Sequence, residues 1–139
     1  MKIKILITVI LLVAGFIIFR SITGYKPLPE NKPWPVPDKD KNMANPVKSD
    51  AASIADGKTL WAKHCQSCHG KSGMGDGSKA AQLKTEAGDF SLPATQTQSD
   101  GSLFYKSSVG RDDMPAFKKK IPDADDMWSI VNYIRTFKK

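Results

Sequence analysis

The only two cysteines of this 139-residue chain, Cys65 and Cys68, stand three positions apart, and His69 follows them directly. Cysteines this close in sequence cannot join distant parts of a domain, so a disulfide framework is excluded. About 90 residues follow the proline-rich segment that ends at residue 49, enough for only a modest hydrophobic core. The cysteine pair therefore needs a chemical explanation rather than a cross-linking one.

The spacing Cys65-x-x-Cys68-His69 is typical of covalent haem attachment. Thiols one helical turn apart can each add to a vinyl group on one edge of the porphyrin, and the next histidine then lies beneath the iron as an axial ligand. A redox Cys-x-x-Cys pair, a zinc site that adds His64 or His69, and a chance match are the alternatives. The redox pair lacks a βαβ context, and the zinc site lacks a second ligand pair downstream. We interpret the segment as the attachment site of one haem c.

Met114 is the candidate for the second axial ligand of the iron. It lies 45 residues beyond His69, in a loop that Pro115 stiffens, so the chain is long enough to wrap around to the far side of a haem. Met74 follows His69 too closely, and Met127 falls on the apolar stripe of a predicted helix. The alternative is that Met114 only packs within its loop. A thioether opposite a histidine favours ferrous iron and suits an electron carrier.

Apolar spacing predicts two helices in the middle of the chain, one within residues 50–65 and one over residues 100–109. In the second, we expect Leu103, Phe104 and Val109 to face inward. The glycine-rich stretch after the histidine is expected to be loop, followed by one or two helical turns over residues 79–84. Residues 92–99 are again expected to be loop.

The acidic run at residues 123–126 predicts the start of a last helix, because carboxylates favour the positive end of a helix. Its apolar stripe consists of Met127, Ile130, Val131 and Ile134. No β-sandwich or βαβ pattern is present, so we predict an all-α, loop-rich domain over residues 50–139.

The N-terminus reads as a membrane anchor over residues 1–24. Lys2 and Lys4 precede an uncharged, mostly apolar run at residues 5–19, and residues 3–22 would form about 30 Å of helix, enough to span a bilayer. No convincing cleavage frame follows. We predict a single pass through the inner membrane, with the N-terminus inside and the folded domain on the periplasmic side. A cleaved signal peptide and a buried core helix are the alternatives.

Residues 25–49 contain six of the nine prolines and predict an extended polyproline spacer without helix. Trp34 and Val36 could instead form a docking motif for a partner groove. Most of the net charge of +7 falls in residues 1–49, where basic residues exceed acidic ones by five, against two in residues 50–139. The folded part thus lacks the basic patch that nucleic-acid binding needs, and we exclude that function.

With these motifs in place, residues 52–137 resemble a mono-haem class I c-type cytochrome in a membrane-anchored bacterial form. Cys65–His69 and Met114–Phe117 match the family's two haem-ligand motifs in order and spacing. The positions of the family that pack where the first and last helices cross are occupied by Gly57, Trp61, Ile130 and Tyr133. The resemblance implies a cytochrome c fold, transfer of single electrons through an exposed haem edge, and respiratory redox complexes as partners.

The chain departs from this family at Ser78, which follows Gly75-Asp76-Gly77 where many bacterial members have proline. The family places a carbonyl for the axial histidine near that proline, and here the fixed φ of proline is lost. We predict a one-electron carrier between membrane or periplasmic redox complexes, not an enzyme. The alternatives are a fixed haem relay subunit of a larger respiratory complex, and a haem peroxidase or gas sensor whose sixth position is open.

Overall fold

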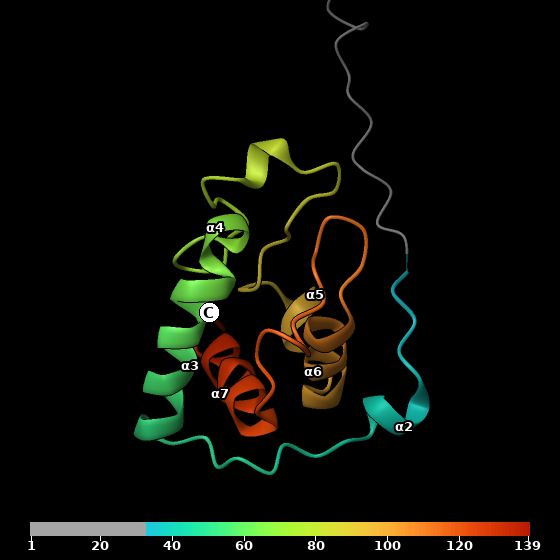
Figure 1. The fold of residues 1–139 in the computed structure, drawn as a ribbon, viewed down its shortest axis with the longest axis vertical. Coiled ribbons are helices and arrows are strands. Elements are labelled where there is room, and N and C mark those ends of the chain that lie inside the picture. The colour runs from blue at the N-terminus through green and yellow to red at the C-terminus, as the bar shows by residue number, and fades with distance from the viewer. Residues whose placement is uncertain (1–32) are drawn as a thin grey trace, which may run out of the picture. The chain divides into compact units, whose positions relative to one another are not determined.

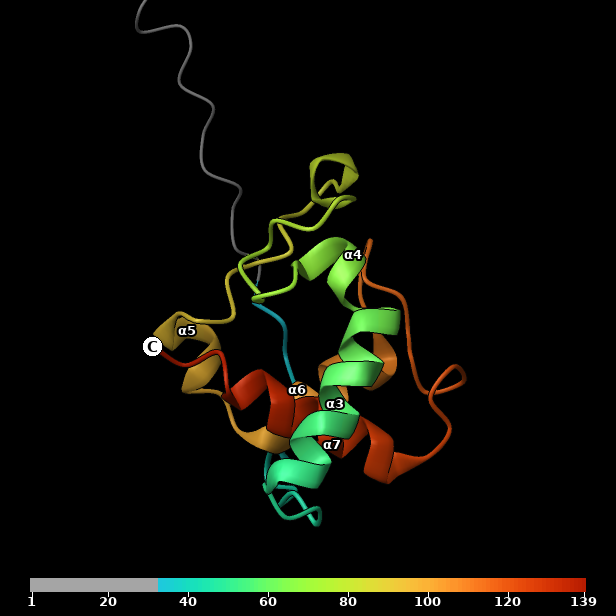
Figure 2. The same ribbon diagram turned by 90° about the vertical axis from the view of Figure 1, so that its left-hand side faces the viewer.

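Helices α3 (Ala51–His64) and α7 (Ala124–Arg135) cross each other at the core of the protein (Figures 1 and 2). The computed structural model describes residues 33–139. Where the helices cross, a Cβ on Gly57 would overlap the carbonyl oxygen of Ser129 and lie 2.9 Å from Cβ of Tyr133. The absence of a side chain at Gly57 therefore permits the close approach, as the sequence predicted.

The hydrophobic core consists of the apolar face of α7 and of the side chains from α3, α6 and the loop after α6 that pack against it. All four residues of the predicted stripe on α7 are buried, so that prediction is confirmed. The ring of Trp61 on α3 lies edge-on to Tyr133, with the ring centroids 6.0 Å apart. The buried hydrophobic residues are Trp61, Leu103, Phe117, Ile121, Met127, Trp128, Ile130, Val131 and Ile134.

Side chains cap the starts of both crossing helices. The Asp50 carboxylate accepts a hydrogen bond from the backbone N–H of Ser53, and the Ser53 hydroxyl accepts one from the N–H of Asp50. At α7, the Asp123 carboxylate accepts from the N–H of Asp125. These caps satisfy N–H groups that the first turn leaves without partners. Helix α7 therefore begins where the acidic run at residues 123–126 predicted.

Helix α6 (Asp100–Val109) spans the range predicted for it. Leu103 is buried, and Phe104 stacks on Trp128 with ring centroids 4.2 Å apart. The inward orientation predicted for Val109 is wrong, since this side chain is 43% exposed. Val109 is the last residue of the helix, and Gly110 turns the chain with a φ of 65°.

Short helices interrupt the long connections between these elements. Helix α4 (Gln66–His69) follows α3, and the 3₁₀ turn η1 (Ala80–Gln82) falls within the turns predicted over residues 79–84. Helix α5 (Pro93–Gln96) replaces a predicted loop, because Pro93 has the φ that a first helical position needs. Residues 33–139 contain no β-strand beyond one isolated bridge, which confirms the all-α, loop-rich prediction for this range.

Residues 33–49 belong to the same compact unit as the haem-motif domain. The prediction that the prolines leave this segment without helix is wrong at α2 (Asp38–Lys41), where Pro37 precedes the first turn instead of interrupting it. The buried amide of Asn132 on α7 holds the segment, because it accepts from Asn45 and donates to the carbonyl of Val47. A buried amide needs such partners, and here residues 45–47 provide them.

The predicted anchor, residues 1–24, and the first part of the proline-rich segment lie outside the described residues. Within residues 33–139, no helix is both long enough and apolar enough to cross a membrane. The anchor therefore stays a prediction.

Candidate functional site

The paired cysteines lie where α3 gives way to α4 (Figure 2). Cys65 is the C-cap residue of α3 and the N-cap residue of α4. Cys68 and His69 follow within the single turn of α4. Both thiols are free and half-buried, and Cys65 packs against the hydrophobic core. A single turn thus brings the two thiols and the imidazole together, as the spacing predicted.

His69 is held by one hydrogen bond and by two aromatic rings. Its Nδ1 lies 2.9 Å from the carbonyl oxygen of Ala87, so this nitrogen carries the proton and donates it. The ring centroid is 4.7 Å from that of Phe90 and 5.7 Å from that of Trp61. Burial lowers the pKa of His69, while the bond to Ala87 acts in the opposite direction. The neutral ring then keeps a lone pair on Nε2, the form in which histidine binds metal ions.

The carbonyl that orients His69 comes from Ala87 and not from the region of Ser78. The backbone around Ser78 packs against α4 instead, since the N–H of Gly77 donates to the carbonyl of Cys68. A Cβ on Gly77 would overlap the carbonyl of Ser67. Sequence reasoning missed Ala87 because a backbone carbonyl has no side-chain signature.

Met114 lies on a tight loop after α6. The backbone groups of Arg111 and Met114 exchange two hydrogen bonds of 2.9 Å, which closes a four-residue turn. Asp112 has a φ of 51° in this turn, a conformation that aspartate and asparagine adopt more readily than most residues. Met114 is half-buried and packs on the same core as Cys65.

Met74, Met127 and His64 have other environments. Met127 is 2% exposed and belongs to the core, as predicted, whereas Met74 is 46% exposed. The ring of His64 lies edge-on to Phe117, with centroids 6.0 Å apart. Burial and the nearby positive charges of Lys63 and Lys120 lower the pKa of His64.

The environment of Cys65 favours the haem interpretation over a redox cysteine pair. Burial, and next the neighbouring Cys68, raises the pKa of the Cys65 thiol to about 12, whereas a reactive redox cysteine needs a lowered pKa. Residues 33–139 contain no group of three or more His, Cys, Asp or Glu side chains arranged to hold a metal ion. Two free thiols beside a neutral, oriented imidazole are the groups that covalent haem attachment requires, so the residues present fit a haem.

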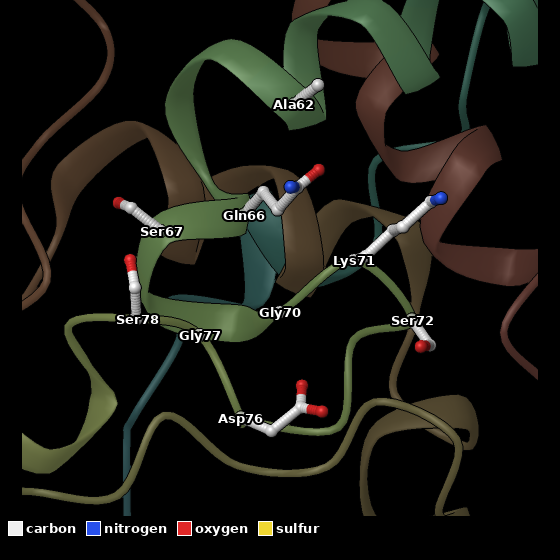
Figure 3. A pocket seen from close by; sticks show the side chains of 9 residues that line it. All are labelled: Ala62, Gln66, Ser67, Gly70, Lys71, Ser72, Asp76, Gly77 and Ser78. Atoms are coloured by element: carbon white, nitrogen blue, oxygen red, sulfur yellow. The ribbon is translucent and has the colours of Figure 1, made fainter.

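A polar hollow of about 440 Å³ beside α4 is a separate feature (Figure 3). Neither thiol lines it, nor does His69 or Met114. Its walls are Ala62, Gln66, Ser67, Gly70, Lys71, Ser72, Asp76, Gly77 and Ser78. The predicted haem ligands therefore do not belong to this hollow.

Comparison with protein families agrees with the site. Residues 52–134 match the family described as cytochrome C oxidase, cbb3-type, subunit III. The match covers more than half of the chain and includes the Cys-x-x-Cys-His segment and Met114, and the chain belongs to this cytochrome c family. Membership implies haem c binding and haem-based electron transfer, which is the chemistry that the motif predicted.

A solved structure shares the fold. It is a chain of the reducing HAO-like protein complex of Kuenenia stuttgartiensis, 22% identical, with a TM-score of 0.60 over 79% of this chain and 53% of that one. The protein thus spans about half the length of that chain, and identity at this level shows the fold alone. A search among curated proteins found no significant match.

Proposed function

We propose that this protein is a one-electron carrier with a single haem c, held covalently by Cys65 and Cys68 and axially by His69 and Met114. The observation that carries the proposal is the 2.9 Å contact between Nδ1 of His69 and the Ala87 carbonyl. His69 directly follows the two cysteines in the sequence, and this contact leaves its Nε2 as the ring nitrogen able to bind iron. The cytochrome c family match supports the same assignment.

Each of the four side chains has a distinct task in this proposal. The thiols of Cys65 and Cys68 hold the edge of the cofactor, and His69 contributes Nε2 to the iron. The thioether of Met114 favours the ferrous state and raises the reduction potential. When bound, the haem supplies an iron that changes reversibly between the ferrous and ferric states. Because His69 and Met114 would together leave the iron no open position, we propose electron transfer rather than an enzymatic or gas-sensing role.

Redox protein complexes are the partners that we propose. The structural neighbour is named as part of a protein complex, which is consistent with a carrier that meets such complexes or with a fixed relay inside one. Detergent extraction followed by identification of bound proteins distinguishes these roles. A fixed relay would be recovered in constant proportion to other subunits, whereas a free carrier would be recovered alone.

We also propose that residues 1–24 anchor the protein in the inner membrane, with the haem domain on the periplasmic side. The basic start and the uncharged run at residues 5–19 support this topology. Intact mass spectrometry of the membrane fraction should find residue 3 onward together with one haem. A soluble protein that begins near Tyr25 would contradict the anchor.

Replacing Met114 with alanine tests the iron ligands. We expect the haem to stay covalently attached and the ferrous iron to bind carbon monoxide readily, because the sixth position is then vacant. A carbon monoxide titration followed by absorption spectroscopy measures this change.

The matched control is Met74→Ala, which removes an exposed thioether from another loop and should behave as the wild type. If the ferrous wild type already binds carbon monoxide at full stoichiometry, Met114 is not the ligand. The peroxidase or sensor alternative would then be favoured.

A further inference from the structure

The side chain next to Met114 joins two loops that are far apart in sequence. Oδ2 of Asp113 accepts hydrogen bonds from the backbone N–H of Lys84 at 2.6 Å and from that of Thr85 at 3.3 Å. Lys84 and Asp113 are 29 residues apart. Asp113 therefore connects the loop that follows α6 to the loop that follows η1.

Each of these loops carries one of the groups that the proposed haem needs. The first contains Met114, directly after Asp113, and the second contains Ala87, whose carbonyl orients His69. Both loops lie at the end of the molecule that carries α4 (Figures 1 and 2). The contact thus links the segments that supply the two axial sides of the proposed site.

The contact is specific to Asp113 rather than general to its acidic loop. The adjacent carboxylate, that of Asp112, lies 3.4 Å from Nε of Arg111, and so faces its own loop. The two N–H groups that donate to Asp113 belong to the loop that follows η1, where no helix provides partners for them. A carboxylate that accepts two such bonds restricts both loops at once.

We propose that Asp113 is a positioning residue that keeps the Met114 thioether at the iron by fixing its loop to the loop of Ala87. This inference rests on the proposed function, because it requires Met114 to be an axial ligand. Without the contact, the Met114 loop has more conformational freedom. Binding of the thioether to iron then costs more conformational entropy. An added ligand then displaces the thioether more easily.

Titration of the ferric, haem-loaded full chain with imidazole tests the proposal, because imidazole must displace the thioether to bind. Asp113→Ala should raise the apparent affinity for imidazole by about tenfold, the size expected for losing a hydrogen-bonded charged group. Asp113→Asn keeps one acceptor oxygen and should have a smaller effect. Asp112→Asn removes the same charge one residue away, in a backbone conformation that asparagine tolerates, and should leave the affinity unchanged.

A substitution in the loop that donates to Asp113 tests the contact without changing the loop that contains Met114. Lys84→Pro removes one donor N–H without altering the Met114 loop, and Leu83 already has the extended backbone, with ψ 145°, that proline requires before it. We expect this variant also to bind imidazole more tightly than the wild type.

Repeating the titration in a Met114→Ala background separates positioning from general stability. With no thioether to displace, Asp113→Ala should no longer change the affinity for imidazole. An effect of equal size in both backgrounds would overturn the inference, as would an unchanged affinity in Asp113→Ala when the wild type is methionine-ligated. A wild type that binds imidazole as tightly as Met114→Ala would overturn the proposed function itself, and this inference with it.

Discussion

At the scale of single residues, Gly57 shows how one missing side chain determines a helix crossing. A Cβ at this position would overlap backbone atoms of Ser129, which cannot rotate away as a side chain can. Any larger residue must therefore move α3 away from α7. The same displacement would disturb Trp61, one turn later on α3, whose indole donates to the Gly70 carbonyl at 3.0 Å.

We predict that Gly57→Ala lowers the free energy of unfolding by about 1–3 kcal/mol, the usual cost of overpacking. Helix propensity alone would raise the free energy of unfolding by about 1 kcal/mol, so the sign of the change distinguishes overpacking from propensity. Urea unfolding of the haem-loaded protein measures the difference. Ala55→Gly, at an exposed position of α3, is the control for propensity. A Gly57→Ala variant about 1 kcal/mol more stable than the wild type, the gain expected from helix propensity alone, would show that the helices can separate at no cost.

At the scale of elements, residues 33–49 act as a strap across the domain rather than as a free spacer. The guanidinium carbon of Arg111 lies 4.5 Å from the centre of the Trp34 ring, and Nη1 of Arg111 donates to the Pro33 carbonyl at 3.0 Å. Arg111 also closes the turn that contains Met114. The strap therefore contacts the Met114 loop on the side of Arg111, while Asp113 connects the loop to residues 84 and 85.

We predict that Trp34→Ala speeds hydrogen exchange at the amides of Arg111 and Met114, because the cation–π contact, worth about 0.5–1 kcal/mol when exposed, is lost. Amides in the core of α7 should be unaffected. Trp34→Phe keeps a ring in place and should show a smaller change. Equal exchange rates in the wild type and Trp34→Ala would mean that the strap does not stabilise this loop. Hydrogen exchange measured by mass spectrometry reports both regions in one experiment.

At the scale of the whole molecule, charge is the feature that bears on partner binding. Lys118, Lys119 and Lys120 form an exposed run just after the Met114 loop, and Nζ of Lys120 lies 5.6 Å from the centre of the Phe117 ring. We expect this run to lie at the rim of the exposed haem edge and to attract negatively charged partners. Asp112 and Asp113 precede Met114 and partly offset the field.

We predict that changing all three lysines to glutamine slows oxidation by hexacyanoferrate(III), a negatively charged probe, by about two- to fivefold at low salt, and weakens the salt dependence of the rate. Stopped-flow kinetics over a range of ionic strength measure both effects. A triple change of Lys39, Lys41 and Lys48 to glutamine removes the same charge from the strap and should have less effect. Equal slowing in the two variants would assign the effect to net charge. The full chain or residues 33–139 should be used, because a fragment from Asp50 would lose the partners of Asn132.

The sequence by itself determined the features that depend on neighbouring residues. Helices α3, α6 and α7 follow from capping residues and apolar spacing, and the grouping of Cys65, Cys68 and His69 follows from a single helical turn. These features are local, so the chain specifies them before distant parts meet. The haem ligands and the anchor stay predictions, whereas the cytochrome c family is shown by the match over residues 52–134.

Only the tertiary structure decided which distant backbone groups serve the site. Backbone carbonyl and N–H groups are common to all sequences, so no residue pattern marks the ones that serve the site. These are the carbonyls of Ala87 and Val47 and the N–H groups of residues 84 and 85. Their roles depend on where the loops lie after α3 and α7 have packed. The packing of residues 33–49 is decided in the same way, because their prolines indicate only local backbone preference, while the buried amide of Asn132 that holds them lies 87 residues beyond Asn45.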